Sequence, residues 1–121
     1  MSTDDRRNIW ETYASAWKAT GAKAKAAALS TSVADHAVYR DPLCQAEGHD
    51  KLIEYMTSFH EQVPGGHFET TYFQAHHDRS VAKWNLRNGQ GLVVGEGVSY
   101  GEYDADGKLA SMTGFFESPP R

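Results

Sequence analysis

The ten residues from Ala34 to Leu43, Ala-Asp-His-Ala-Val-Tyr-Arg-Asp-Pro-Leu, decide how the rest of the chain is interpreted. Under the two-residue repeat of a β-strand, Ala37, Tyr39 and Asp41 share one face. Pro42 lacks a backbone N–H and favours an extended conformation for the residue before it, so the strand is expected to end in a turn at the Asp-Pro pair. If this face points inward, the Asp41 carboxylate is carried to the edge of an apolar interior.

Two helices are expected ahead of this strand. Apolar residues recur at helical spacing from Ile9 to Trp17 and place three aromatic rings on or near one stripe. Gly21 is expected to end the first helix, and the Ala-rich segment 22–29 is expected to form a second one. The hydroxyl run Ser30-Thr31-Ser32 is expected to break that second helix before the strand begins. The three rings of the stripe are those of Trp10, Tyr13 and Trp17.

A loop and a third helix are expected after the Asp-Pro turn. Residues 45–48 are interpreted as the loop. The segment His49–Val63 has apolar residues, Phe59 among them, on one side and charged residues on the other, which is typical of a helix packed on a core. Pro64-Gly65-Gly66 is expected to end it.

Downstream of residue 66 the apolar period changes to two, which predicts a run of strands. Asn88-Gly89 and the segment 104–107 are typical hairpin turns. In the first strand one face is expected to hold Phe68, Thr70, Tyr72, Gln74 and His76. The three strands that follow are expected at residues 81–86, 92–103 and 108–117.

The order of these elements predicts the fold class. Helices followed by hairpin-connected strands indicate an α+β protein with the helices on one face of the sheet. Glycines at positions 91, 95, 97 and 101 of the third long strand indicate bends, since glycine inside a strand usually marks a bulge or a close approach. We therefore expect one domain over residues 1–121. It should be a cone-shaped, curved antiparallel sheet, a half barrel, wrapped around the N-terminal helices with an internal pocket.

Composition excludes several classes of function. The 121 residues carry a net charge of −4 without a cluster of Lys and Arg, which argues against nucleic acid or an anionic membrane as partner. No apolar run approaches the roughly 20 residues of a membrane span. The one cysteine, Cys44, cannot form an internal disulfide, and a reducing, cytoplasmic location is the default expectation.

The aromatic faces predict the wall of the pocket. Four rings on the first helix, the Asp-Pro strand, the third helix and the second long strand are expected to line one cavity that opens near Asp41. They belong to Trp17, Tyr39, Phe59 and Trp84. The expected occupant is a small hydrophobic ligand.

Nearly the whole chain resembles the nuclear-transport-factor-2-like superfamily, and within it the SnoaL-like and ketosteroid-isomerase-like families. The resemblance lies in the order and spacing of several pieces rather than in any one motif. The pieces are the aromatic first helix, Ala-Asp-His-Ala-Val-Tyr-Arg-Asp-Pro (34–42), the Gly48-led helix with Ile53, the Trp84 strand, Tyr-Asp-Ala-Asp-Gly-Lys-Leu (103–109) and Phe-Phe-Glu (115–117).

This resemblance implies roles for three residues. Asp41 matches the general base of ketosteroid-isomerase-like enzymes, and Tyr13 matches the phenol that donates to the substrate oxygen. Where those isomerases carry a second, protonated acid, this chain has Ser99, a weaker donor expected to contact the substrate. An Asp before Pro also commonly caps its own turn, and Tyr13 also fits a core aromatic, so both alternatives stay open.

The histidines and the cysteine give no metal site and imply no cofactor. His76 and His77 are neighbours, and neighbours on a strand point to opposite faces, so they are not expected to serve one site. No histidine has the spacing of a helical ligand pair. His60 or His76 would be the choice if a histidine assisted the chemistry. Cys44 is expected to be an unreactive thiol.

Two functions from different classes follow. The first is a cofactor-free isomerase or lyase that moves a proton on a small hydrophobic carbonyl compound, with Asp41 as base and Tyr13 as donor. The second is a non-catalytic ligand-binding or dimerisation module of the same fold. Four long strands with only three helices to cover them leave one sheet face open, which predicts a homodimer through that face.

Overall fold

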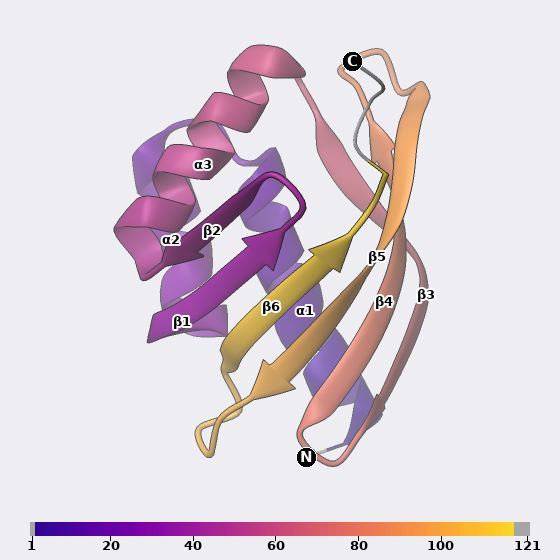
Figure 1. Ribbon diagram of the computed structural model, residues 1–121. Helices are drawn as coiled ribbons and strands as arrows, with labels where there is room; N and C mark the ends of the chain where they lie inside the picture. Colours follow the sequence, from indigo (N-terminus) through magenta and orange to yellow (C-terminus); the bar gives the residue numbers. More distant parts are fainter. Residues whose placement is uncertain (1, 118–121) are drawn as a thin grey trace.

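The computed structural model describes residues 2–117, in which three helices pack against a six-stranded sheet (Figure 1). The helices lie on one side of the sheet, and the long strands bend around α1. The elements in chain order are α1 (Thr3–Lys18), α2 (Ala22–Ser32), β1 (Val33–Asp41), β2 (Cys44–Glu47), α3 (His49–Gln62), β3 (His67–His76), β4 (Arg79–Arg87), β5 (Val93–Tyr103) and β6 (Leu109–Phe115).

The strand order is β2-β1-β6-β5-β4-β3, and the sheet is not closed. The last four strands pair antiparallel through hairpins, as expected. Strand β1 pairs antiparallel with β2 and parallel with β6, which makes the sheet mixed rather than wholly antiparallel. The predicted fold class, a curved α+β cone with an internal pocket, is confirmed.

The helices follow the sequence pattern with one difference in length. A capping box starts α1, in which Asp5 N–H donates to Ser2 Oγ at 3.1 Å and Ser2 N–H donates to the Asp5 carboxylate at 3.3 Å. The predicted break after residue 29 is wrong, because α2 continues to Ser32 and leads directly into β1. Hydroxyls of residues 30–32 donate to carbonyls three or four residues earlier, which is compatible with the helix continuing.

The segment after the Asp-Pro turn is a strand, where the sequence predicted a loop. Asp41 pairs with Cys44 and Tyr39 with Ala46, so β1 and β2 form a tight hairpin. The segment is short and carries little β-propensity, so the pairing comes from the turn and not from the pattern of β2. This hairpin fixes the Asp41 backbone at the end of the sheet.

A bulge in β3 reverses the predicted face of its second half. Thr70 pairs with Trp84 but Tyr72 pairs with Lys83, which leaves Thr71 as the extra residue. Phe68 and Thr70 therefore point inward, as do Phe73 and Ala75, whereas Tyr72 and the residues at 74 and 76 point outward. The single alternation predicted over the whole strand was wrong beyond residue 70.

The core lies between the inner face of the sheet and the three helices. It contains rings from α1 and aliphatic side chains from every layer, among them Trp10, Tyr13, Leu29, Met56 and Met112, all at most 4% exposed. Among residues 2–117, no helix has the length and apolar character needed to span a membrane.

Candidate functional site

A cavity of about 480 Å³ opens between α1, α3 and the inner face of the sheet. Residues of β1, β3, β4, β5 and β6 close its other walls, so the curvature of the sheet creates the space. All seven residues predicted for the site border it, namely Tyr13, Trp17, Tyr39, Asp41, Phe59, Trp84 and Ser99. Their chemical roles stay predictions.

Trp17 lies at the centre of the aromatic wall. Its ring centroid is 5.4 Å from that of Phe59 and 5.8 Å from that of Tyr55, both with edge-to-face geometry. Tyr39 lies at 5.7 Å in a tilted arrangement, and Phe68 at 5.4 Å. Edge-to-face pairs of this kind stabilise by about 0.5–1.5 kcal/mol beyond area burial. The wall is therefore a rigid aromatic surface contributed by four elements.

The Asp41 carboxylate accepts three hydrogen bonds at the end of β1. Its Oδ1 accepts from the backbone N–H of Leu43 at 2.8 Å, which caps the turn. Its Oδ2 accepts from the hydroxyl of Tyr39 at 2.5 Å and from that of Tyr55 at 2.8 Å. Among the described ion pairs none involves Asp41. The carboxylate is thus held by neutral donors, with an oxygen bordering the pocket.

Sequence reasoning missed Tyr55. The residue lies on α3, fourteen positions from Asp41, and its hydroxyl meets the carboxylate only because α3 crosses the β1 end of the sheet. Its place on the apolar face of the predicted helix was visible in the sequence. No spacing rule connects a helix position to the last residue of a preceding strand, so the contact itself was not predictable.

Three tyrosine hydroxyls around Asp41 are held in the protonated form. Burial raises the pKa of Tyr39, and the neighbouring Tyr13 and the negative charge of Asp41 raise it further. Burial likewise raises the pKa of Tyr55, with its hydrogen bond to Asp41 acting in the same direction. For Tyr13 burial raises the pKa, against the effect of a hydrogen bond from Trp17. Each hydroxyl is therefore a donor throughout the neutral pH range.

Tyr13 differs from Tyr39 and Tyr55 because none of the described hydrogen bonds joins its hydroxyl to Asp41. Its oxygen accepts from the indole of Trp17, one helical turn away, and its side chain is only 3% exposed. A phenol in this position can donate to the oxygen of a ligand in the pocket. This geometry is compatible with the predicted role, and it equally satisfies a core aromatic.

Ser99 lies across β6 from Asp41. Gly114 lies on β6, between Asp41 on β1 and Ser99 on β5. A Cβ atom at Gly114 would be 3.6 Å from both the Asp41 Cβ and the Ser99 Oγ. The Ser99 hydroxyl accepts from the indole N–H of Trp84 at 3.0 Å, which leaves its own hydrogen for another acceptor. Ser99 therefore orients a wall residue and also offers a donor.

None of the described residues that border the pocket is a histidine. His60 contacts the carbonyl of Trp17 through Nε2, and its Nδ1 lies 3.1 Å from the Lys25 ammonium, which ties three helices together. His49 contacts the carbonyls of Val33 and Ala34 through Nε2, and His67 contacts the carbonyl of Gly65 through Nδ1. The suggestion that His60 or His76 assists chemistry has no support in the lining of this cavity.

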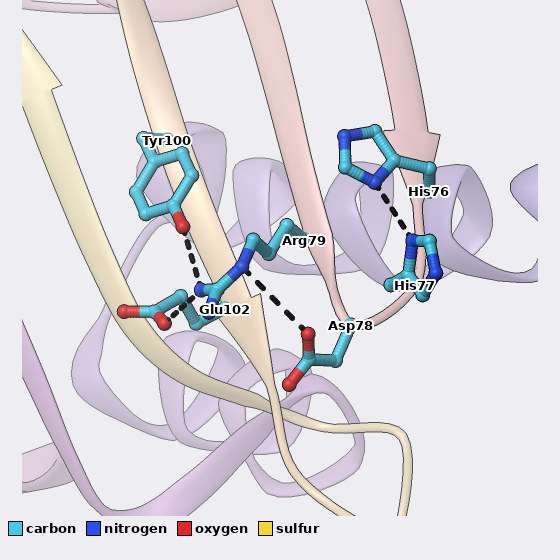
Figure 2. A network of polar contacts seen from close by, with 6 residues as sticks. All are labelled: His76, His77, Asp78, Arg79, Tyr100 and Glu102. Atoms are coloured by element: carbon cyan, nitrogen blue, oxygen red, sulfur yellow. Dashed lines mark hydrogen bonds and ion pairs between the residues drawn. The ribbon is translucent and has the colours of Figure 1, made fainter.

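The two neighbouring histidines do meet, contrary to the sequence prediction (Figure 2). Their Nδ1 atoms are 3.0 Å apart. His77 lies in the turn after β3 with φ of +53°, so strand alternation no longer applies to it. Beside the pair, the Arg79 guanidinium donates to Tyr100 at 2.7 Å and pairs with Glu102. Among the described residues no group of three His, Cys, Asp or Glu side chains could hold a metal ion.

Cys44 is half-buried opposite Asp41 in the β1–β2 hairpin. Burial raises the pKa of its thiol, and the charge of Asp41 raises it further. A thiol with a raised pKa is a poor nucleophile near neutral pH.

Comparison with known families gives one match that spans most of the chain. The family model of the SnoaL-like domain matches residues 10–112. A search of the curated proteins finds no match.

Several solved structures share the fold. A candidate isomerase of the SnoaL-like family from Agrobacterium tumefaciens superimposes with a TM-score of 0.87 at 22% identity, covering 95% of this chain and 99% of that one. A candidate polyketide cyclase from Sinorhizobium meliloti gives 0.72 at 16% identity, with 94% and 99% covered. A protein from Catenulispora acidiphila with a ketosteroid-isomerase-like fold, in complex with trimethylamine, gives 0.73 at 14% identity, with 90% and 85% covered. At these identities the likeness shows the fold alone.

Proposed function

The chain belongs to the SnoaL-like family, and on this premise we propose that its pocket binds a small, mainly apolar carbonyl compound on which Asp41 moves a proton. The reaction is an isomerisation or elimination that uses no cofactor. The observation that carries the proposal is the Asp41 carboxylate, which borders an aromatic cavity and accepts hydrogen bonds from three neutral donors.

In the proposed reaction the carbonyl oxygen of the ligand accepts from the Tyr13 hydroxyl, with the Ser99 hydroxyl as a second donor. This polarisation makes the C–H bond next to the carbonyl more acidic. Asp41 takes that proton through Oδ1 and becomes a neutral acid, while the ligand becomes an enolate. Returning the proton to another carbon completes an isomerisation, and loss of a leaving group completes an elimination.

The anchoring of Asp41 supports a base more than it hinders one. A base must be held in position, and the hydroxyls of Tyr39 and Tyr55 do this by donating to Oδ2. The turn contact from Leu43 uses one lone pair of Oδ1, so a second remains for the substrate proton.

The same turn contact favours a second candidate, a ligand-binding module without chemistry. In that case Asp41 caps the Asp-Pro turn and anchors two tyrosines, and the pocket only holds its ligand. The two candidates differ in what removal of the charge does, because asparagine keeps an oxygen for the Leu43 N–H but cannot act as the base.

The test uses a β,γ-unsaturated cyclohexenone, whose conversion to the conjugated isomer is followed by ultraviolet absorbance. We expect the protein to accelerate the conversion and Asp41→Asn to lower the rate by about 10²–10⁴-fold. Asp106→Asn removes the same charge from the β5–β6 turn and is the matched control. If the ketone binds without conversion, the catalytic proposal fails and the binding module stands. If Asp41→Asn remains fully active, the assignment of Asp41 as the base fails.

A further inference from the structure

The charges around the cavity restrict what it can hold. Two acidic side chains lie at its edge, the half-buried Asp41 and the exposed Glu117. A third acidic residue, Glu96, borders the cavity only through the backbone of β5, because Gly95 and Gly97 on either side of it face inward and its own side chain therefore points to the outer face of the sheet. None of the described residues that border it is Lys, Arg or His. The field inside such an opening is negative, and a cleft with low-dielectric walls focuses that field.

The aromatic wall of the cavity also favours a positively charged ligand. Nine aromatic side chains border it, and the faces of aromatic rings attract cations. The rings are those of Trp10, Tyr13, Trp17, Tyr39, Tyr55, Phe59, Phe68, Trp84 and Phe116. The ring faces and the carboxylates of Asp41 and Glu117 would both repel an anionic ligand.

The contacts of the Asp41 carboxylate give a separate reason to expect a positively charged ligand. The carboxylate is stabilised only by hydroxyl and amide donors, so its charge is not neutralised by a described cationic side chain. A half-buried anion of this kind gains from a positive charge that enters the pocket, because the effective dielectric constant there is lower than in water.

We propose that the ligand is an apolar compound carrying a protonated or quaternary amine, whose positive charge is held among the aromatic rings and the acidic residues Asp41 and Glu117. This inference rests on the proposed function of the cavity as a ligand pocket and narrows its ligand class. The apolar body fills the deep aromatic end next to Trp10 and Trp17, which are 4% and 5% exposed. Carboxylic acids and phosphates are excluded by the same charges.

The test compares three ligands of similar size by isothermal titration calorimetry. They are meta-tert-butylphenol, its isosteric cation (meta-hydroxyphenyl)trimethylammonium, and the anion meta-hydroxybenzoate. We expect the cation to bind about tenfold more tightly than the neutral isostere and the anion to bind most weakly. Salt should weaken binding of the cation and leave that of the neutral phenol unchanged.

Variants show which charges are responsible. Glu117→Gln should reduce the preference for the cation by about twofold to threefold without changing the affinity for the neutral phenol. Asp106→Asn, which makes the same change of charge away from the cavity, should leave the preference intact. If the neutral phenol binds as tightly as the cation, or more tightly, the inference of a cationic ligand is overturned, whereas the proposed ligand pocket remains supported. If none of the three ligands binds, the ligand pocket of the proposed function fails as well.

Discussion

The Asp41 carboxylate caps a turn, accepts hydrogen bonds from two tyrosine hydroxyls and borders the pocket. Its Oδ1 caps the Asp-Pro turn through Leu43, and its Oδ2 accepts from Tyr39 and Tyr55. A carboxylate in this position is structurally constrained whether or not it reacts. Replacing one of the tyrosine donors therefore measures how much its hydrogen bond to the carboxylate contributes to stability.

We expect Tyr55→Phe to lower the free energy of unfolding by about 1–2 kcal/mol, since a hydrogen bond to a charged acceptor is lost. Tyr72→Phe is the matched control, because Tyr72 is 46% exposed on the outer face of the sheet. Its effect should stay within about 0.5 kcal/mol. Urea unfolding at neutral pH measures both, and equal effects of the two changes would contradict the importance of the Tyr55 contact.

Alkaline pH should destabilise the protein through the same tyrosines. The pKa values of Tyr13, Tyr39 and Tyr55 are raised by burial, so above about pH 10 the unfolded chain loses phenol protons that the folded chain keeps. The free energy of unfolding then falls by up to about 1.4 kcal/mol per pH unit for each tyrosine. The stability they contribute is complete below pH 10 and is lost as the pH rises toward their folded-state values.

One group acts with the opposite sign and must be separated in the measurement. Burial lowers the pKa of Lys25, so its contribution to stability rises with pH and is complete near pH 10.4, about the ordinary value for lysine. Urea unfolding curves from about pH 8 to about pH 12 should therefore show a decline that steepens above pH 11. Tyr39→Phe should reduce the fall in the free energy of unfolding with pH by the contribution of one ionising group. A constant free energy of unfolding across this range would contradict the raised pKa values of the three tyrosines.

The sequence predicted one half of this residue-scale arrangement. Strand alternation places Tyr39 and Asp41 on one face, and their side chains do meet. The contact between Tyr55 and Asp41 could not be predicted from the sequence, because it depends on the angle at which α3 crosses the sheet. Periodicity indicates which face of a helix is buried but not which buried atom it meets.

At the scale of elements, close approach between neighbouring strands sets the space for the pocket. Gly97 on β5 faces Trp84 on β4, and an added Cβ would lie 2.4 Å from the indole and 2.7 Å from the carbonyl oxygen of Phe115. The glycine therefore allows the indole to lie flat against β5. The sequence indicated bends at such glycines, and for Gly97 the reason is this contact rather than a special backbone conformation.

We expect Gly97→Ala to lower the free energy of unfolding by about 1–3 kcal/mol, because a methyl group must displace the indole or the strand. Gly95→Ala on the same strand is the matched control, since its Cβ would meet Leu86 at an ordinary 3.7 Å. That change should stay within about 0.5 kcal/mol, or stabilise. Thermal unfolding of the two variants side by side tests this, and equal stabilities would show that Trp84 is free to move.

The elements that sequence reasoning missed share a physical cause. The bulge at Thr71 and the strand β2 are both created by pairing with a neighbour, and pairing leaves little trace in the segment itself. The long helices and the last four strands were predicted because their apolar repeats are long. Only their ends differ, by a residue or two for most elements, as for β6 at Leu109–Phe115.

At the scale of the whole molecule, the helices cover only one face of the sheet (Figure 1). The outer face carries polar pairs such as Arg87 with Glu69, but it also exposes large apolar side chains. Phe115 is 56% exposed opposite Val98, and Tyr72 is 46% exposed. An apolar surface of this kind on a sheet is a common site of self-association.

We propose that two copies of the chain associate through this outer face. A stable interface needs about 800 Å² from each partner. Sedimentation equilibrium at micromolar concentration should give about twice the chain mass of 13.4 kDa. Phe115→Lys should shift the mass to that of one chain, because a C2 interface meets the introduced charge twice. Leu43→Lys, at an equally exposed position bordering the pocket, should remain dimeric. A single-chain mass for the unmodified protein at every concentration would mean that the exposed apolar face stays in water without a second copy.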